Sequence, residues 1–319
     1  MLIVQKFGGT SLADPERLRR AAGICRAARE QGHRLILVVS APGDTTDRLS
    51  EDAQALQAEP DLREMDALLA TGEQQSAARM AMALEELGVP ARSLTGWQAG
   101  LITDSRHGDA DIRLLLPDRL RETLREDRVA VVAGFQGVDR RGDITTLGRG
   151  GSDTTAVALA AALGAERCEI YTDVDGIYTA DPRLVPEARL LKEIDSRDML
   201  ALARGGSQVL HPRSVALALS GGLTLQLLSS FRPGPGTAVR LLEESRRPAF
   251  AGVTRDPGSH TVTAVGRAAD GACLAELVTL LTQNGVPVLS AEAEEGAVHL
   301  RVEPAQLPLA LELAHQALF

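Results

Sequence analysis

The chain contains 319 residues, a length typical of about two domains. It carries 43 acidic and 34 basic residues, and a net charge of −9 argues against non-specific nucleic-acid binding, which depends on neutralising phosphates. With 44% hydrophobic and 24% charged residues, the composition is that of a globular protein and excludes a disordered or collagen-like chain. No apolar run approaches the roughly 18 residues of a membrane span, so we expect no membrane partner.

Two further features indicate a cytoplasmic protein. Gln5 and Lys6 interrupt the apolar N-terminus too early for a signal peptide. The three cysteines, Cys25, Cys168 and Cys273, have neither CxxC nor metal-binding spacing, and we expect them to be reduced, buried thiols.

The first two thirds of the chain alternate apolar strand-like runs with helical stretches. Leu2–Phe7 predicts a strand, and a helix follows over 14–31, with Asp14 as its expected cap and Pro15 in its first turn. Further strands are predicted over 35–40, 129–134, 169–172 and 223–229, and further helices over 65–87 and 154–163. Strands that are apolar throughout predict an α/β fold, a three-layer αβα sandwich whose mainly parallel sheet is covered on both faces. Ligands of such sheets bind at the carboxyl ends of the strands.

The pattern of apolar residues along the chain changes after a proline-rich turn at 232–237 and a polar linker at 243–248. Strands are predicted over 250–254, 261–266, 286–292 and 297–302, and helices over 272–284 and 304–318. This pattern resembles the small α+β ACT ligand-binding module. We therefore expect two domains, an α/β one over 1–242 and a single ACT-like one over 248–319.

The segment KFGGTS (6–11) follows the first strand and precedes the first helix. Two adjacent glycines allow the backbone to approach a polyphosphate closely, and the helix that follows presents free N–H groups. Lys6 would reach the transferred phosphoryl group as a compact charge, and it is one of only two lysines among 34 basic residues, the other being Lys192. The segment matches neither the Walker pattern nor GxGxxG, and a tight turn with an incidental lysine is the alternative.

Seven motifs in chain order resemble the aspartate kinases of the amino acid kinase family. They are KFGGTS (6–11), VSAPGDTT (39–46), TGE (71–73), GFQG (134–137), TLGRGGSDTT (146–155), YTDVDGIYTADPR (171–183) and VLHP (209–212). The resemblance implies the amino acid kinase fold and ATP-dependent phosphorylation of the side-chain carboxylate of L-aspartate, the first step toward lysine, threonine and methionine. Mg²⁺ is expected to be held mainly by the ATP phosphates, with no dedicated protein metal site.

The resemblance also implies roles for individual residues. Lys6 and Asp153 are the implied catalytic pair. The implied ATP contacts are Lys6, Phe7, Gly8, Gly9, Thr172, Asp173, Tyr178, Arg183, Gln208 and Val209. The implied aspartate contacts are Ser40, Thr46, Glu73, Arg149, Gly150, Gly151 and Ser152. Taken singly, Ser40 and Thr46 also fit turn residues, Glu73 a solvated helix residue, and Asp153 a helix cap.

The sequence departs from the family pattern in three places. Gln208 stands where many relatives have a lysine, and Leu227-Leu228 lacks an arginine often found before the serine pair. In the C-terminal module, the stretch 266–273 lacks the usual proline-glycine turn. We therefore expect the module to retain homodimer or higher homo-oligomer contacts and to have lost feedback inhibition, while a working lysine or threonine sensor stays open.

Two other functions remain open. One is another small-molecule kinase of the same fold, acting on glutamate, an acylated glutamate or a nucleotide. The other is an amino-acid sensor without catalysis, against which the presence of Lys6 and Asp153 argues. His211 is interpreted as a structural residue before Pro212, and the six histidines show no metal spacing.

Overall fold

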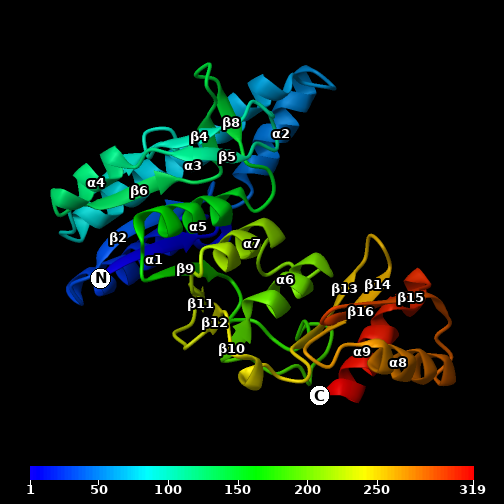
Figure 1. Cartoon of the computed structure of the whole chain (residues 1–319). Coiled ribbons are helices and arrows are strands. Elements are labelled where there is room, and N and C mark those ends of the chain that lie inside the picture. Colours follow the sequence, from blue (N-terminus) through cyan, green and yellow to red (C-terminus); the bar gives the residue numbers. More distant parts are fainter. The chain divides into compact units, whose positions relative to one another are not determined.

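The computed structural model describes all 319 residues, and the chain forms two compact units (Figure 1). The first unit contains residues 1–173 and 223–234, and the second contains residues 174–222 and 235–319. This division differs from the expected boundary at residues 242–248, which stays a prediction.

The first unit is built on a parallel sheet with the strand order β11-β9-β1-β2-β6-β3. Its strands are β1 (Leu2–Phe7), β2 (Arg34–Val39), β3 (Ala91–Leu94), β6 (Val129–Ala133), β9 (Arg167–Thr172) and β11 (Leu225–Ser229). The central strands β2 and β6 are buried almost throughout, because helices cover both faces. The parallel α/β sheet predicted from the sequence is confirmed.

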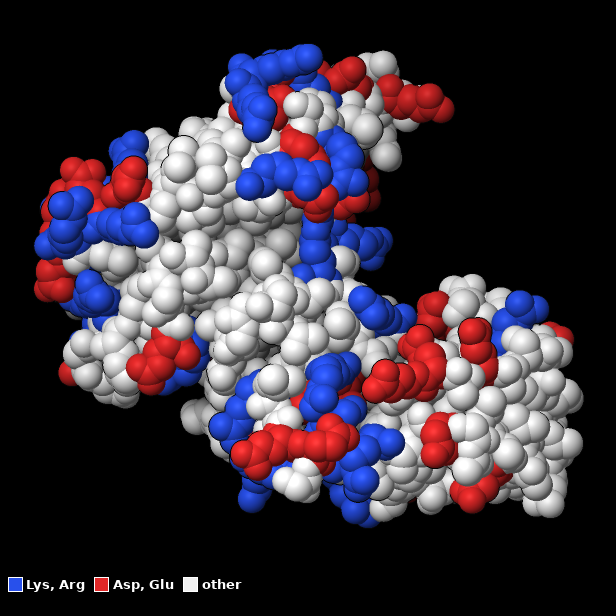
Figure 2. Space-filling model, in the orientation of Figure 1, with Lys and Arg blue, Asp and Glu red and all other residues white.

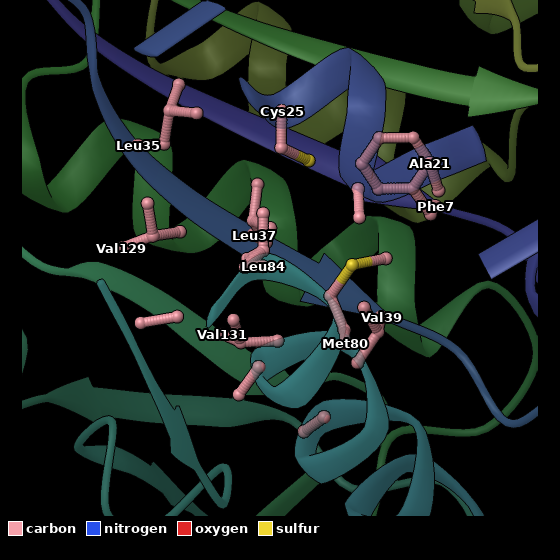
Figure 3. Close-up of a cluster of buried hydrophobic side chains, with 14 of the residues drawn as sticks. Phe7, Ala21, Cys25, Leu35, Leu37, Val39, Met80, Leu84, Val129 and Val131 are labelled. Carbon is pink, nitrogen blue, oxygen red and sulfur yellow. The ribbon is translucent and has the colours of Figure 1, made fainter. Parts of the chain in front are cut away.

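Helices form the outer layers of this unit. They are α1 (Pro15–Glu30), α2 (Thr45–Leu56), α3 (Leu62–Glu86), α4 (Asp118–Arg125) and α5 (Gly151–Leu163), with a 3-10 turn η1 (Gly9–Leu12). Figure 3 shows the core on one face, where Phe7, Leu37 and Val131 from the sheet pack against α1 and α3. α5 packs against β1, β2 and β9. Because side chains alternate along a strand, Val4 and Lys6 lie on the face opposite Phe7, the face that α5 covers.

A small second sheet completes the first unit. Its strand order is β5-β4-β7-β8, formed by β4 (Leu101–Thr103), β5 (Ile112–Leu115), β7 (Gln136–Val138) and β8 (Ile144–Thr146). β7 and β8 form an antiparallel pair, and β8 ends directly before the glycine-rich segment that starts α5.

The second unit begins with short elements and ends with the C-terminal module. Its elements are β10 (Glu193–Asp195), α6 (Ser196–Arg204), α7 (Pro212–Ser220), β12 (Thr237–Arg240), η2 (Glu244–Arg246), β13 (Gly252–Asp256), β14 (Thr261–Val265), α8 (Gly271–Gln283), β15 (Val288–Glu294), β16 (Ala297–Val302), η3 (Pro304–Gln306) and α9 (Leu307–Leu318). β13-β14-β16-β15 form an antiparallel sheet whose buried face packs against α8 and α9. The expected α+β module is therefore present.

Two further expectations from the sequence, the cap of α1 and the burial of the three thiols, are also confirmed. Asp14 caps α1 by accepting a hydrogen bond from the Arg17 N–H at 2.8 Å. Cys25, Cys168 and Cys273 are free, buried thiols, and burial raises the pKa of each. None of the helices combines the length and the apolar character needed to cross a membrane.

Candidate active site

Lys6 and Asp153 meet at the carboxyl end of β1. Lys6 points to the face of the sheet that α5 covers, and Asp153 is the third residue of α5. The Lys6 Nζ lies 2.7 Å from the Asp153 Oδ1, and the two side chains are 12% and 13% exposed. The ion pair is thus partly shielded from water, which strengthens it, while one edge stays open to a ligand.

The glycine pair after Lys6 forms a turn against a second loop. The Gly8 N–H donates to the Tyr171 carbonyl at 3.2 Å. At Gly9 a Cβ would lie 2.7 Å from the Ala41 carbonyl oxygen, so only glycine allows this approach. The Gly43 N–H in turn donates to the Gly9 carbonyl at 2.9 Å. The KFGG and SAPG motifs are therefore packed together.

The glycine-rich segment before α5 forms a left-handed turn. Gly148 and Gly150 have φ values of +69° and +68°, a conformation that L side chains rarely adopt. Gly150 is the N-cap residue, so Asp153 is not the cap of α5. The first residues of a helix leave N–H groups without intrahelical partners, which attract an anion. Ser152 is buried and Arg149, at the tip of the turn, is exposed.

Glu73 is a buried carboxylate on α3, which excludes the interpretation as a solvated helix residue. It is 3% exposed, and its Oε1 accepts a hydrogen bond from the Ala41 N–H at 3.0 Å. Its Oε2 is also buried and has no protein partner. Burial raises the pKa of Glu73 from 4.5 to about 7. An unpaired buried carboxylate oxygen is suited to receive a cationic group of a ligand.

Ser40 and Thr46 lie on the segment that follows β2. The Ser40 N–H donates to the Phe7 carbonyl at 3.2 Å, which places Ser40 beside the end of β1. Thr46 is half-buried in the first turn of α2. The neighbouring Thr45 donates its hydroxyl to the Pro42 carbonyl at 2.6 Å, so this hydroxyl is used within the turn.

The end of β9 brings Thr172 and Asp173 next to β1. The Thr172 hydroxyl donates to the Asp173 Oδ1 at 3.1 Å. The Thr172 carbonyl accepts from the Ser230 N–H at 2.9 Å. Phe7 stacks on Tyr171 with ring centroids 4.7 Å apart and is fully buried. The side chain of Phe7 therefore belongs to the core, and only its backbone is left for a nucleotide.

Four expected nucleotide residues lie in the second unit. Tyr178 is half-buried and pairs with Leu190 in an isolated β-bridge. Arg183 binds Asp181 at 2.7 Å and holds the pKa of that carboxyl below its usual value. Gln208 is exposed and Val209 half-buried. Nearby, the His211 ring caps α7 by accepting from the Arg213 N–H at 3.3 Å, which agrees with the structural interpretation of His211.

Comparison with known proteins identifies the family. The model of the amino acid kinase family matches residues 1–229. The aspartokinase of Thermus thermophilus is 47% identical over 287 residues, which cover 90% of this chain and 71% of that protein. The chain belongs to the amino acid kinase family. Within it, the chain belongs to the aspartokinases.

Solved aspartokinases have the same fold. A crystal structure of aspartate kinase from Synechocystis is 42% identical, with a TM-score of 0.70 over 98% of this chain and 54% of that one. Aspartokinase III of E. coli, solved with aspartate and ADP, is 28% identical with a TM-score of 0.73 over 95% of this chain and 79% of that one. The same enzyme solved with lysine and aspartate is 27% identical, with a TM-score of 0.71 over 99% of this chain and 83% of that one.

The structure also adds residues to this aspartokinase site that the motifs left without a role. At Gly134 a Cβ would lie 3.0 Å from the Ser152 Oγ, so this glycine makes room for the start of α5. Phe135 has a φ of +69°, which is strained for a bulky residue. The Phe135 ring lies against Gly151, where an added Cβ would be only 2.8 Å from the ring. The GFQG motif was the available signal, but a motif alone does not tell which neighbour each residue touches.

Proposed function

We propose that this aspartokinase transfers the γ-phosphoryl group of ATP to the side-chain carboxylate of L-aspartate, giving 4-phospho-L-aspartate. The observation that carries the proposal is the 2.7 Å pairing of Lys6 with Asp153. This contact joins the two glycine-rich turns at the carboxyl end of a parallel sheet, where α/β proteins bind their ligands. It also sets a compact cation beside the N-terminus of α5.

Phosphoryl transfer needs positioning and charge neutralisation more than covalent chemistry. An oxygen of the aspartate side chain forms a bond to the γ-phosphorus while the bond to the β-phosphate oxygen breaks, and ADP leaves. The attacking carboxylate, with an ordinary pKa of about 3.9, is already ionised at neutral pH, so no general base is required. Lys6 and the Gly9 amide neutralise charge on the transferred group, and Asp153 holds Lys6 in place. The Gly8 amide was expected to share this role, but its N–H already donates to the Tyr171 carbonyl.

Mg²⁺ is proposed to bind through the ATP phosphates. No three His, Cys, Asp or Glu side chains are grouped so that they could hold a metal ion. The carboxylates at this edge of the sheet are Asp153, which is already paired with Lys6, and Asp173, which accepts from the Thr172 hydroxyl. This donor set fits a metal ion that arrives with the nucleotide better than a site made by the protein alone. When bound, the ion would neutralise charge on the phosphate oxygens.

The substrate amino acid is proposed to bind between an anionic and a cationic group. The free Oε2 of Glu73 is suited to its ammonium group, and the exposed Arg149 guanidinium to a bidentate carboxylate contact. Ser40, Thr46 and Ser152 would supply hydroxyl contacts, and Gly150 and Gly151 backbone contacts. Thr172, Asp173, Tyr178, Arg183, Gln208 and Val209 are proposed ATP contacts on the motif resemblance alone.

The C-terminal module is proposed to support a homodimer or higher homo-oligomer. Aspartokinase III of E. coli has been solved with lysine, so lysine is the first effector to test. Threonine is the second. We propose that feedback inhibition is lost, because the stretch 266–273 departs from the usual ligand turn. The three free, buried thiols support a proposed location in the reducing cytoplasm. The proposed reaction is the first step toward lysine, threonine and methionine.

An ATP-coupled assay tests the proposed function. L-aspartate, L-glutamate, N-acetyl-glutamate and UMP are offered at equal concentrations, with and without lysine and threonine. We expect turnover with L-aspartate only, giving a hydroxylamine-reactive acyl phosphate, and no strong inhibition by either effector. Preference for another substrate would replace the proposed reaction with another of the same fold, and strong inhibition would show a working sensor.

A further inference from the structure

Asp66 is a fully buried carboxylate to which the proposed reaction gives no role. It lies in the second turn of α3 and is 0% exposed. Its Oδ2 is 2.8 Å from the His107 Nδ1, and both its oxygens accept from the Gly108 N–H at 3.1 Å. Its Oδ1 also accepts from the Thr146 hydroxyl at 2.5 Å. A buried carboxylate with this many donors is a fixed point around which two separate segments are held.

Both segments that Asp66 holds adjoin the turn with Arg149. Thr146 is the last residue of β8, and its carbonyl accepts from the Ala110 N–H at 2.8 Å. Two residues later, a Cβ on Gly148 would lie 2.8 Å from the Asp109 Oδ1 and 3.2 Å from the Gly108 carbonyl oxygen. The loop at 107–110 therefore lies directly against the backbone from which Arg149 projects.

The same face of α3 carries Glu73. Residues seven apart return to one face after two turns, so Asp66 and Glu73 are about 10 Å apart along the helix axis. Glu73 holds the Ala41 N–H at 3.0 Å while Asp66 holds Thr146. One rigid helix thus binds both the loop after β2 and the turn before α5.

We propose that Asp66, through Thr146 and His107, is a positioning residue for aspartate binding that fixes the Arg149 turn relative to Glu73. The inference rests on the proposed function, because Arg149 and Glu73 are the proposed partners of the substrate carboxylate and ammonium. Asp66 touches no reacting atom. Its loss frees the turn and weakens aspartate binding, while the Lys6–Asp153 pair and the Gly8-Gly9 turn, which bind no atom of Asp66, keep their geometry.

The chain offers a matched pair of variants for the test. Thr146→Val removes only the hydroxyl that binds Asp66. Thr145→Val removes a hydroxyl from the adjacent residue, which is equally buried and binds the Thr103 hydroxyl at 2.5 Å instead. Asp66→Asn keeps the shape of the side chain and removes its charge. The KM for aspartate, the KM for ATP and kcat are measured for all three and for the unchanged chain.

We expect the KM for aspartate to rise about tenfold in Asp66→Asn and Thr146→Val, as for the loss of one buried charged hydrogen bond. The KM for ATP stays within about twofold, and Thr145→Val changes neither constant despite a comparable loss of stability. Hydrogen exchange of the backbone at 107–110 and 146–151 should accelerate in the first two variants and not in Thr145→Val.

The results distinguish a positioning role of Asp66 from a merely structural one. If Asp66→Asn and Thr146→Val raise the KM for aspartate no more than Thr145→Val does, Asp66 has a merely structural role and the inference is overturned. The same conclusion follows if these two variants raise the KM for aspartate and the KM for ATP equally. Unchanged exchange at 146–151 would overturn the inference too, even where Asp66→Asn folds poorly, because Thr146→Val gives an independent reading. If the unchanged chain does not phosphorylate aspartate, the proposed function itself fails. If it does and the variants match it, only the inference on Asp66 fails.

Discussion

At the scale of single residues, the site depends on where one charged side chain meets another. Lys6 follows three apolar residues and Gln5 on β1. Because side chains alternate between the two faces of a strand, Lys6 lies on the face covered by α5, where its Nζ is 2.7 Å from the Asp153 Oδ1. An arginine would keep the charge but not the compact ammonium group, and Lys6 and Lys192 are the only lysines in a chain whose other basic residues are arginines.

Replacing Lys6 tests its role directly. Lys6→Ala should lower kcat by about 10³-fold or more, because a preorganised cation at the transferred group is lost. Lys6→Arg should recover little of this activity. The other lysine, Lys192, is exposed, and Lys192→Ala provides the control in the same assay, with circular dichroism to check the fold. Near-normal turnover in Lys6→Ala would exclude a role for this residue in the transfer.

The raised pKa of Glu73 predicts a pH dependence of substrate capture. Only the ionised carboxylate receives an ammonium group well, so kcat/KM for aspartate should rise with pH around the value of about 7 caused by burial. Glu73→Gln should lower kcat/KM and flatten the profile. The measurement is kcat/KM from pH 5.5 to 8.5, and the same titration in both proteins would contradict the assignment.

The pKa of Glu73 also has a consequence for stability. A carboxyl with a pKa of 4.5 in the unfolded chain and about 7 in the folded one binds more protons when folded between these values. The free energy of unfolding contributed by Glu73 therefore decreases as the pH rises from about 4.5 to about 7. Burial of this carboxylate, the proposed partner of the substrate ammonium group, therefore lowers the stability of the fold at neutral pH.

At the scale of elements, α3 and the loop after β2 are joined by close packing as well as by the hydrogen bond from Ala41 to Glu73. A Cβ on Gly72 would lie 2.8 Å from the Ala41 Cβ, which is shorter than any normal contact. The Ala41 N–H is also the donor to Glu73, so the approach of these two elements and the burial of Glu73 depend on the same glycine.

A comparison of two helical glycines tests this packing. Gly72→Ala should lower the free energy of unfolding by about 1–3 kcal/mol through overpacking. Gly23→Ala in α1, where a Cβ meets nothing within 4 Å, should raise it by about 0.5–1 kcal/mol because alanine favours the helix. Chemical unfolding of both variants gives the values. Stabilisation by Gly72→Ala would show that the loop moves away without cost.

Several elements were beyond the reach of sequence patterns. α3 begins at Leu62 rather than 65 because Asp61 caps it, and α5 begins at Gly151 rather than 154 because Gly150 adopts a left-handed conformation. Strands β4, β7 and β8 have three residues each, too few to show a period, and were not predicted. Figure 2 shows that acidic and basic side chains lie next to one another in several groups on the face drawn, with broad areas of other residues between these groups.

At the scale of the whole molecule, the second unit contains both the segment around Tyr178, a proposed ATP contact, and the C-terminal module. Thr179, next to Tyr178, accepts from the Val253 N–H through its carbonyl at 2.7 Å. Its hydroxyl lies 2.9 Å from the His315 Nε2 on α9, and this contact is buried. The residue after Tyr178 is thus fixed by both the sheet and the last helix of the module.

This contact predicts how stability changes with pH. Burial, helped by Arg189, lowers the pKa of His315 below its ordinary value of 6.5. Below that pH the unfolded chain binds a proton that the folded one does not, so the free energy of unfolding should fall as the pH drops below about 6.5. His315→Gln should reduce this slope, whereas Thr179→Val should lower stability by about 1 kcal/mol at every pH. Equal slopes in all three proteins, measured by urea unfolding, would contradict the prediction.

The sequence by itself determined the α/β class, the elements around β1 and α1, the chemical nature of the glycine-rich turns and the family, because periodicity, caps and motifs are local properties of the chain. It did not reveal that Glu73 is buried with one free oxygen, that Phe7 belongs to the core, or that Asp66 holds the Arg149 turn. These facts arise where segments far apart in the chain pack together. Tertiary structure alone decides them, since burial and unpaired polar atoms depend on which neighbours arrive rather than on the residue itself.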